Sequence, residues 1–506
     1  MLLWALFAAV FGHALYFLFL NIAQPVTGPY GFRQAQTAIS VFWILRDGVH
    51  LSYETPVLGY PWTIPLEFPV YQWLLAAVAY FGAPIEIAGR LWSFTFFAGL
   101  MLPLRVLYRA LELPWYALPI TGILLFASPL YIYFARTVSI ETCALFFAAV
   151  WLALLVRFLK QRSAIGLPTI IAAGALAALA KITTFIDFGA VGAVTTMAVL
   201  WQVRRSRREI ASIIALSGLA GFVPFAIGYG WTIYSDRIKS LGLITSLFTS
   251  EVQRKWIFGS LDTRLSAAFW QNILDRDVHN VLGYGAPVAL LVCGAALTHR
   301  TRPYILIALA GFVLAPLMFA GLFHQDYYVV ANGIFAIVAV ALGITALAGA
   351  EGTHMVAVAI VAILAGQLLY FQIHFADYVR TDTRNEIYQI ALKAKEHIPP
   401  SSGLIVFNGD WSSEVNFYAE RKGIAVPFWL PLDIMLRLST NPASLLGDMP
   451  LGGIVHCANP APPYRSPLME AINVFISERK VIASIGQCKL LAAENHTTGE
   501  TSIVPP

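Results

Sequence analysis

The chain has 506 residues, of which 58% are hydrophobic and only 12% are charged. Soluble domains carry about 25% charged residues, so this composition excludes a disordered chain, a soluble enzyme and a nucleic-acid-binding protein. What remains is a polytopic membrane protein. The charge is uneven as well, because residues 376–506 hold 11 basic and 13 acidic side chains, whereas the chain as a whole has a net charge of +5. The basic surplus therefore belongs to residues 1–375, where it should mark cytoplasmic loops.

Residues 1–375 contain a series of long apolar segments, and a spanning helix needs about 20 such residues. Eleven segments are candidates: 2–22, 88–109, 115–133, 141–159, 167–180, 184–202, 210–232, 284–298, 303–323, 327–348 and 354–374. Two of them, 167–180 and 284–298, are short. The sequence thus predicts a mainly α fold, a polytopic transmembrane helical bundle with about eleven spans.

The first loop, 23–87, contains two further helical segments. Phe32–Arg46 is amphipathic, which favours a helix lying on the bilayer surface. A Pro-rich stretch, Tyr53–Pro69, follows it. The apolar segment 68–82 begins directly after Glu67 and is too short to span, so we expect a helix in or near the membrane interface.

Short basic loops fix the expected orientation. The clusters are Lys160–Arg162, Arg204–Arg208 and His299–Arg302, with Arg105 and Arg109 at the end of another span. With eleven spans these loops all fall on one side, which must be the cytoplasm. The opposite side then receives four pieces: 23–87, 134–140, 233–283 and the residues from about 375 onward.

Residues 376–506 alternate between helical and strand patterns, which predicts a small three-layer α/β domain on the extracytoplasmic side. The expected helices are Glu386–His397, Ser412–Lys422 and Pro467–Glu478, and the expected strands are Gly403–Asn408, Ile424–Phe428, Gly453–Cys457, Lys480–Ile485 and Cys488–Ala492. Cys143 and Cys293 lie in apolar spans and are expected to be inert. Cys457 and Cys488 end neighbouring strands, and an oxidising compartment permits a disulfide between them without requiring one.

Ionisable and polar residues gather near the outer ends of the spans, although such residues are costly there. They come from five separate segments: Arg33, Gln34, Gln36 and Glu67, then Arg90, then Arg136 and Glu141, then Lys181 with Asp187, and finally His324, Asp326, Tyr327 and Tyr328. Cations and carboxylates that converge at one depth suit a cavity for an anionic amphiphile such as a lipid phosphate.

Several motifs occur in an order that resembles a known family. They are FRQAQTA, LEFPVYQWL, AGRLWS, FARTVSIET, LAALAKITTF and HQDYYV, followed in the tail by GLIVFNGDWSSEVNFYAERKGIAVP. Together they resemble GT-C class integral-membrane glycosyltransferases, in particular the ArnT and protein-mannosyltransferase-like group with its Rgt-type lipid A glycosyltransferases. The resemblance implies a lipid-linked sugar donor, amphipathic juxtamembrane helices in the first outer loop, and a small outer domain after the last span.

The resemblance also implies roles for individual residues. Glu67 and Glu141 stand at acidic positions of the family and are the expected catalytic residues. Arg90 and Lys181 match basic residues that hold the donor phosphate, and Arg33 and Arg136 could stabilise the same departing charge. The remaining candidates are assigned to substrate binding: Gln34, Gln36, His324, Asp326, Tyr327 and Tyr328.

One departure from the family concerns the first loop. A related subgroup reads Asp-Trp-Arg-Gln-Ala-Asp-Thr where this chain has Gly-Phe-Arg-Gln-Ala-Gln-Thr at 31–37, and by spacing to Asp47 the family's usual acids fall on Arg33 and Gln34. Both acids are missing. Because transfer to a hydroxyl requires a base within hydrogen-bond reach, either Glu67 or Glu141 takes that role, or the acceptor is already anionic and needs no base.

Structural interpretations of the same residues stay open at this point. Glu67 and Glu141 begin helices, where acids are favoured by the helix dipole. Arg33, Arg90 and Lys181 are also compatible with anchors at the membrane interface. Arg136 could pair with Glu141, and Asp187 could neutralise Lys181. No cofactor is certain, and His324 with Asp326 gives only weak grounds for a divalent metal.

The sequence as a whole predicts a glycosyltransferase that moves a sugar, with inversion, from a polyprenyl-phosphate donor to a lipid, glycan or protein acceptor. It would lie in a bacterial inner membrane, with the site and residues 376–506 facing the periplasm. Two alternatives remain: a lipid or sugar transporter or flippase, and a catalytically inactive family member.

Overall fold

The structure is a computed structural model that describes residues 2–161, 166–202, 206–350, 353–380, 383–458 and 463–495. Arg162, Arg204 and Arg205, three of the expected cytoplasmic basic residues, lie outside this part of the chain. Contacts divide the chain into two compact units. The helical unit comprises 1–23, 66–234 and 250–380, and the α/β unit comprises 24–65, 235–249 and 381–506.

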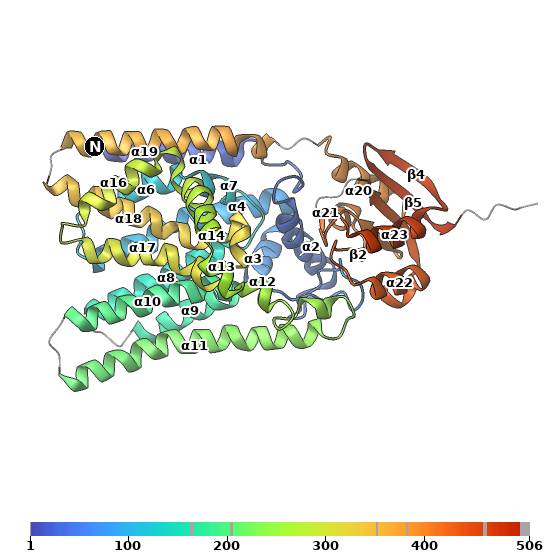
Figure 1. Ribbon diagram of the computed structural model, residues 1–506, viewed down its shortest axis with the longest axis horizontal. Coiled ribbons are helices and arrows are strands. Elements are labelled where there is room, and N and C mark those ends of the chain that lie inside the picture. Colours follow the sequence, from blue (N-terminus) through green and yellow to red (C-terminus); the bar gives the residue numbers. More distant parts are fainter. Residues whose placement is uncertain are drawn as a thin grey trace, which may run out of the picture. The chain divides into compact units, whose positions relative to one another are not determined.

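The helical unit is built from apolar helices that pack side by side (Figure 1). The helices of residues 1–202 are α1 (Leu2–Phe19), α3 (Val70–Ala79), α4 (Ile85–Gly99), α5 (Met101–Ala110), α6 (Ala117–Ala127), α7 (Pro129–Phe134), α8 (Glu141–Gln161), α9 (Leu167–Ala180) and α10 (Ile182–Gln202). The helices that follow are α11 (Arg207–Lys239), α12 (Arg254–Phe258), α13 (Leu261–Leu265), α14 (Ala267–Asn272), α15 (His279–Leu282), α16 (Ala286–Ala296), α17 (Arg302–Met318), α18 (Val329–Ala350) and α19 (Thr353–His374). A helix pairs its backbone groups internally, which an apolar segment in a bilayer must do.

Among the described residues, eight helical stretches are long and apolar enough to cross a membrane. They are Leu2–Phe19, Ile85–Ala110, Glu141–Gln161, Ile182–Trp201, Arg207–Lys239, Ala267–Ala296, Asp326–Gly349 and His354–His374, and they coincide with eight of the eleven expected spans. The other three, 115–133, 167–180 and 303–323, coincide with shorter apolar helices. The chain is therefore an integral membrane protein, whereas the number eleven stays a prediction.

Two helix breaks refine the expected spans. The span expected at 115–133 is interrupted at Ser128, which is extended because it precedes Pro129. The second break separates α9 from α10 at Lys181, whose backbone is extended with φ −165° and ψ 103°. The break brings an ionisable side chain to the junction of two apolar helices.

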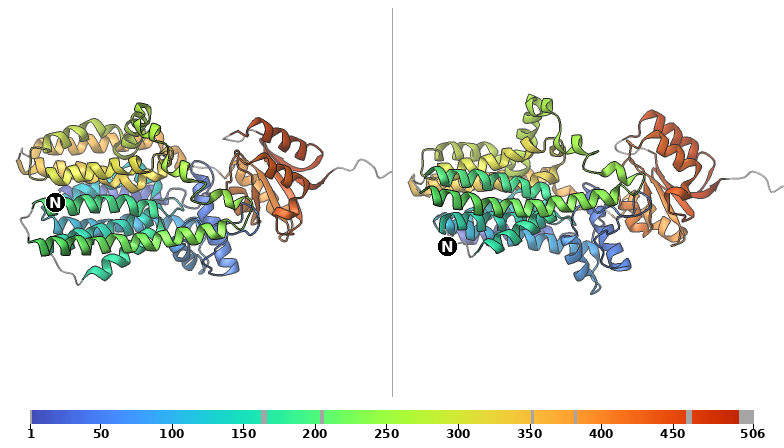
Figure 2. Two further views of the ribbon diagram at one scale, coloured as in Figure 1. Left: turned by 60° about the horizontal axis from the view of Figure 1, so that its bottom comes forward. Right: turned by 90° about the horizontal axis from the view of Figure 1, so that it is seen from below.

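The α/β unit contains a five-stranded sheet with the order β2-β1-β3-β5-β4. Its strands are β1 (Gly403–Phe407), β2 (Gly423–Ala425), β3 (Leu451–Cys457), β4 (Arg479–Ile485) and β5 (Cys488–Asn495). β1 pairs in parallel with β2 and β3, whereas β5 pairs antiparallel with β3 and β4. The helices are α20 (Glu386–His397), α21 (Glu414–Ala419), α22 (Leu432–Thr440) and α23 (Ser466–Ile476), with α20 packed on α21 and α22 on α23. Helices lie on both faces of the sheet, which gives the expected three layers (Figure 2).

Some boundaries in this unit differ from the sequence expectation. The helix expected over Ser412–Lys422 is limited to α21, because Ser412 and Ser413 form the turn before it and Glu420 adopts a left-handed conformation that ends it. The strand expected over Ile424–Phe428 ends early at Ala425, close to Pro427, which has no N–H to donate. Helix α22 was not expected.

Residues of the first loop complete this sheet at its β2 edge. The backbone N–H groups of Gly423 and Ala425 donate to the carbonyls of Pro56 and Val57 at 3.0 and 2.7 Å. In return, the N–H of Gly59 donates to Gly423, and Leu58 forms an antiparallel bridge with Ile424. The edge of β2 is therefore paired rather than exposed, so the first loop and the C-terminal residues fold together.

The first-loop helix α2 (Gly31–Asp47) belongs to this same unit and packs on α21. We expected a helix on the bilayer surface, with a polar side in water. In the structure Gln34, Gln36 and Ser40 on that side are buried, and Ser40 Oγ lies 2.8 Å from Thr55 Oγ1. The polar side of α2 is therefore hydrogen-bonded within the protein, while its place at a bilayer surface stays a prediction.

A buried carboxyl lies where α2 meets α21. Glu414 accepts a 2.8 Å hydrogen bond from Ser412 Oγ and a further one from the backbone of Gly28. Burial raises the pKa of Glu414 to about 7. The carboxyl is therefore easier to protonate in the folded protein than in an unfolded chain.

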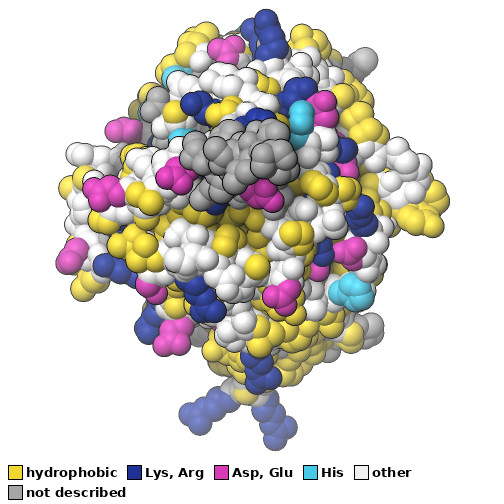
Figure 3. All heavy atoms as spheres, turned by 90° about the vertical axis from the view of Figure 1, so that its right-hand side faces the viewer, with side chains coloured by type: hydrophobic (Ala, Val, Ile, Leu, Met, Phe, Trp, Pro, Cys, Tyr) yellow, Lys and Arg dark blue, Asp and Glu magenta, His cyan; other side chains and the backbone are white. Residues whose placement is uncertain are grey.

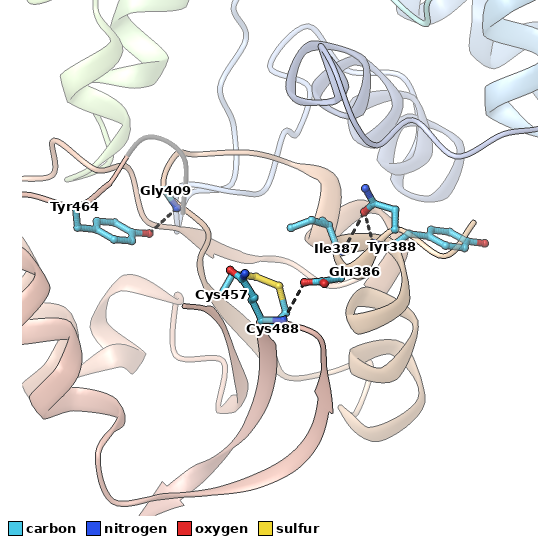
Figure 4. Close-up of a disulfide and its surroundings, with 9 residues drawn as sticks. Glu386, Ile387, Tyr388, Gly409, Cys457, Tyr464 and Cys488 are labelled. Carbon is cyan, nitrogen blue, oxygen red and sulfur yellow. Dashed lines mark hydrogen bonds between the residues drawn. A yellow bond between two sulfur atoms is a disulfide. The ribbon is translucent and has the colours of Figure 1, made fainter. Parts of the chain in front are cut away.

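The two tail cysteines form a disulfide that joins neighbouring strands (Figure 4). Cys457 ends β3, and Cys488 begins β5 directly opposite it. The sequence left this bond open, and the structure resolves it. Cys143 and Cys293 are free and buried in the helical unit.

We predict that thiol labelling will distinguish the two disulfide-bonded cysteines from the two free ones. The unfolded, non-reduced protein should react at two of its four cysteines, and at all four after reduction. The double variant Cys457→Ser/Cys488→Ser should destabilise the α/β unit by about 2–4 kcal/mol, measured by thermal unfolding of the full chain. Four reactive thiols without reductant would contradict the bond.

We also predict a pH dependence of stability that arises from Glu414. Its folded pKa of about 7 lies above the unfolded value, so its contribution to stability falls as pH rises between the two values. Replacing it by the uncharged Gln should remove this loss. The melting temperature of Glu414→Gln relative to the wild type should therefore increase from pH 5 to pH 8, whereas the exposed control Glu470→Gln should show no such trend. A pH-independent difference would contradict the assignment.

Candidate functional site

The helix break at Lys181 brings a cation against an acid. Lys181 Nζ lies 2.5 Å from Oε2 of Glu141, the first residue of α8. The lysine side chain is 7% exposed and the glutamate side chain 1%. A pair this deeply buried is kept only when each charge has its partner, since either one alone is costly in an apolar environment. The structure therefore pairs Lys181 with Glu141.

The sequence left open whether Arg136 pairs with Glu141 and whether Asp187 neutralises Lys181, and this pairing decides both questions. Glu141 pairs with Lys181, while Arg136 binds a backbone carbonyl. Asp187 lies one to two turns further along α10, and neither of its carboxyl oxygens has a hydrogen-bond partner among the described residues. The carboxylate that neutralises Lys181 is thus Glu141.

Two tyrosines cover the other side of Lys181. Its Nζ lies 4.3 Å from the ring centre of Tyr328 and 5.6 Å from that of Tyr327. A cation over an aromatic face is attracted by the ring, and the attraction grows when water is excluded. A lysine has three N–H donors, and one of those of Lys181 bonds Glu141.

The turn that carries these tyrosines is held by Arg276, which the sequence did not single out. Arg276 Nε lies 3.0 Å from Asp326 and 2.8 Å from Asp277, and the guanidinium also donates to the backbone carbonyls of Phe323 and His324. Arg276 lies in a π-helical turn, Ile273–Val278. Its fork of donors therefore holds the turn at Phe323, His324 and Asp326, directly before the two tyrosines.

Arg90 and Arg136 bind the end of α1. Arg90 Nη1 donates to Ile22 O at 2.5 Å, and Arg136 Nη2 donates to Leu20 O at 2.8 Å. These carbonyls follow the helix end, where unpaired C=O groups carry partial negative charge. The two guanidinium groups are 1% and 2% exposed, and burial together with the charge of Arg90 lowers the pKa of Arg136 to about 9. Two cations buried this close together favour an anion nearby.

The segment that carries Glu67 lies near Lys181 in space, although the two residues are far apart in the sequence. Glu67 is half-buried just before α3, and the N–H of the next residue, Phe68, donates to Leu179 O at 3.2 Å. Leu179 is two residues before Lys181, so the segment that carries Glu67 docks on the last turn of α9. His324, by contrast, is exposed, and only its backbone is seen to take part in the Arg276 cluster.

The three candidates on α2 lie in the α/β unit. Arg33 Nη1 donates to Gln36 Oε1 at 2.5 Å within α2, and Gln34 and Gln36 are buried. Lys422, from the C-terminal residues, lies 2.5 Å from Glu54 and 3.4 Å from Asp47 at the other end of that helix. Burial raises the pKa of Glu54 even though Lys422 lowers it.

The predicted residues thus form three groups. The first is the pair Glu141–Lys181 with Tyr327, Tyr328 and the nearby Glu67 segment; the second is Arg90 with Arg136; the third is Arg33, Gln34 and Gln36 on α2. In the described chain no three His, Cys, Asp or Glu side chains converge on one point as metal ligands. A cavity of about 340 Å³ around Leu154, Phe158 and Ile170 includes none of the predicted residues.

Three residues that matter here were missed by sequence reasoning. Arg276 and Asp277 are neighbours in the polar stretch 271–280 of the expected outer loop, where nothing local distinguishes them from the other charged residues. Glu414 offered no signal either, because an acid before a short helix in a charged tail is typical of a surface position. The face of the protein shown in Figure 3 mixes Lys and Arg with Asp and Glu side chains and has no large area of one sign.

No protein-family model matches the sequence. No curated protein matches it either. Solved structures do match over nearly the whole chain. The crystal structure of ArnT from Cupriavidus metallidurans bound to undecaprenyl phosphate gives a TM-score of 0.65 at 14% identity and covers 99% of both chains.

Two other structures extend this comparison. The archaeal oligosaccharyltransferase AglB from Archaeoglobus fulgidus gives a TM-score of 0.57 at 10% identity, over 91% of this chain and 70% of that one. The arabinofuranosyltransferase AftD from Mycobacteria gives 0.53 at 13% identity, over 97% of this chain and 42% of that one. All three are GT-C glycosyltransferases, and the fold that the sequence motifs implied is confirmed: the chain has the GT-C fold of integral-membrane glycosyltransferases.

Proposed function

We propose that this chain is a glycosyltransferase that moves a sugar from a polyprenyl-phosphate donor to a lipid, glycan or protein acceptor. The observation that carries the proposal is the buried Lys181–Glu141 pair beneath Tyr327 and Tyr328, at a helix break in a chain with the GT-C fold. Two neighbours support the donor class, since ArnT is bound to undecaprenyl phosphate and AglB to a dolichol phosphate with an inhibitory peptide.

In this proposal Lys181 binds the phosphate that leaves. Glu141 pairs with the lysine and fixes the position of its ammonium group, and the two tyrosine rings shield that group from water. Arg90 and Arg136 add positive charge at the end of α1. Arg33, on α2 in the α/β unit, is a further candidate for phosphate binding. Cations placed where charge develops stabilise the departing phosphate, so the bond between the anomeric carbon and the phosphate oxygen breaks more easily.

Glu67 is the base that we favour. Glu141 already holds Lys181 in a salt bridge, whereas Glu67 is half-buried on a segment that docks next to the lysine. The acceptor hydroxyl oxygen would attack the anomeric carbon, its proton would pass to Glu67, and the phosphate would leave from the opposite face with inversion. An acceptor that is already anionic would not need Glu67.

The remaining candidates would bind substrate. Gln34 and Gln36 on α2 and Asp326 beside the tyrosines supply hydrogen-bonding groups of the kind that sugar hydroxyls require, and His324 lies on the same turn. We place the site and residues 376–506 on the extracytoplasmic side, in a bacterial inner membrane, because the basic clusters mark the opposite face.

The proposal is tested by measuring transfer from polyprenyl-phosphate sugars to membrane lipid, glycan and peptide acceptors in reconstituted vesicles. Lys181→Met should lower kcat/KM by on the order of a hundredfold or more, and Glu67→Gln should lower kcat with little change in donor KM. The exposed control Glu470→Gln should behave as the wild type. No transfer with any donor, together with lipid movement between leaflets, would replace the proposal by a flippase; no transfer and no movement would indicate an inactive chain.

A second prediction separates the contribution of the Lys181–Glu141 pair to stability from its contribution to activity. Lys181→Met leaves a buried carboxylate unpaired, which should destabilise the protein by about 3–5 kcal/mol. The double variant Lys181→Met/Glu141→Leu removes both charges and should recover much of this stability while remaining inactive. Thermal unfolding in detergent provides the measurement. A double variant less stable than the single variant would show that the two groups are not coupled.

A further inference from the structure

The first turn of α2 lies against a carboxyl group from the C-terminal residues. Oε1 of Glu414 lies only 2.1 Å from the point that a Cβ atom at position 31 would occupy. Gly31 does not have a positive φ, so its backbone would accept another residue. The nearest obstacle to a larger residue is therefore the carboxyl, followed by the backbone carbonyl oxygen of Val26 at 3.0 Å from the same point.

The carboxyl itself is held firmly. Ser412 Oγ donates to Oε2 at 2.8 Å, the backbone of Gly28 hydrogen-bonds the same group, and Glu414 is only 8% exposed. Further along α21, the hydroxyl of Tyr418 accepts a 2.6 Å hydrogen bond from the N–H of Val26. The segment that leads into α2 is thus fixed at several points by α21 and the loop before it.

The same loop adds an aromatic contact to the first turn. The rings of Phe32 and Trp411 meet edge to face with centres 5.1 Å apart. Arg33 is the next residue, and its guanidinium hydrogen-bonds Gln36 one turn later. Because α2 is a continuous helix, a group that fixes its first turn also fixes the direction of Arg33.

We propose that Glu414 is a positioning residue, whose hydrogen-bonded carboxyl seats the first turn of α2 through Gly31 and so sets the direction of Arg33. This inference rests on the proposed function, in which Arg33 contributes to phosphate binding. The pKa of about 7 that Glu414 has in the folded protein agrees with a neutral, hydrogen-bonded carboxyl, which an amide can mimic. Glu414 is not proposed to touch the substrate.

The contact is tested by a double-mutant cycle in the full-length protein. Gly31→Ala places a methyl group on Glu414 Oε1, and Glu414→Ala removes the carboxyl; each should lower kcat/KM for a short-chain polyprenyl-phosphate sugar by on the order of tenfold or more. Gly31→Ala/Glu414→Ala relieves the overlap and should be at least as active as Gly31→Ala alone. Losses that simply multiply would overturn the inference.

Two further measurements separate positioning from a purely structural role. Glu414→Gln should retain activity within about threefold, as expected for a preserved hydrogen-bond geometry. In an Arg33→Ala background, Glu414→Ala should cause no further loss of kcat/KM, because the residue that it positions is gone. An equal loss in both backgrounds, or a Glu414→Gln variant as poor as Glu414→Ala at an unchanged melting temperature, would overturn the inference. Glu470→Ala is the matched control.

A readout that does not depend on transfer keeps the two proposals distinguishable. Amide hydrogen exchange over residues 28–36 should be faster in Glu414→Ala than in the wild type, in Glu414→Gln and in Glu470→Ala. Unchanged exchange in Glu414→Ala would overturn the positioning role while active wild-type protein upheld the proposed function. Absence of transfer by the wild type would overturn the proposed function, and with it the role of Glu414 in catalysis, whatever the exchange shows.

Discussion

The buried cations of the candidate site are each matched by a partner, because an apolar environment does not replace the water that a charge has lost. Lys181 forms a salt bridge with Glu141, while Arg90 and Arg136 donate hydrogen bonds to backbone carbonyls after the end of α1. Arg276 combines both solutions by binding two carboxylates and two backbone carbonyls. These pairings hold together helices whose apolar surfaces resemble the lipid around them and therefore gain little from the hydrophobic effect.

The same requirement explains why the polar residues are informative about function. Lys181 is placed by a helix break, covered by two tyrosines and paired with a glutamate, although an apolar residue would be simpler to accommodate there. A buried lysine in this arrangement has a use if it binds a negatively charged ligand, and the proposed lipid phosphate would be that ligand. The Arg276 cluster holds the residues directly before the two tyrosines.

The membrane part of the fold could be predicted from sequence because long apolar segments admit few structures. The strands β1 and β3 were also predictable, since their buried apolar runs are bounded by turn residues. What the sequence did not contain was contact between distant segments. Nothing local indicates that Pro56–Gly59 pairs with β2, or that Glu414 lies on Gly31. The break at Ser128 had a local signal in Pro129, whereas Arg276 required knowledge of the turn that it binds.

The candidate site divides in the same way. Lys181 and Glu141 were both singled out from the sequence, but their pairing with each other was not. Arg136 was the nearer partner along the chain, only five residues from Glu141. Partner choice depends on which helix ends meet in three dimensions, and this information is distributed over the packing of the whole unit.

The hydrogen bonds between the first loop and β2 have a consequence for how this protein can be altered. Residues 381–495 cannot be exchanged as an independent cassette, since a graft would leave the backbone groups of Gly423 and Ala425 without the carbonyls that they now meet. A chimera with another protein of the same fold would have to carry residues 24–65 along with the tail. Sequence changes in these two distant stretches are therefore constrained to occur in concert.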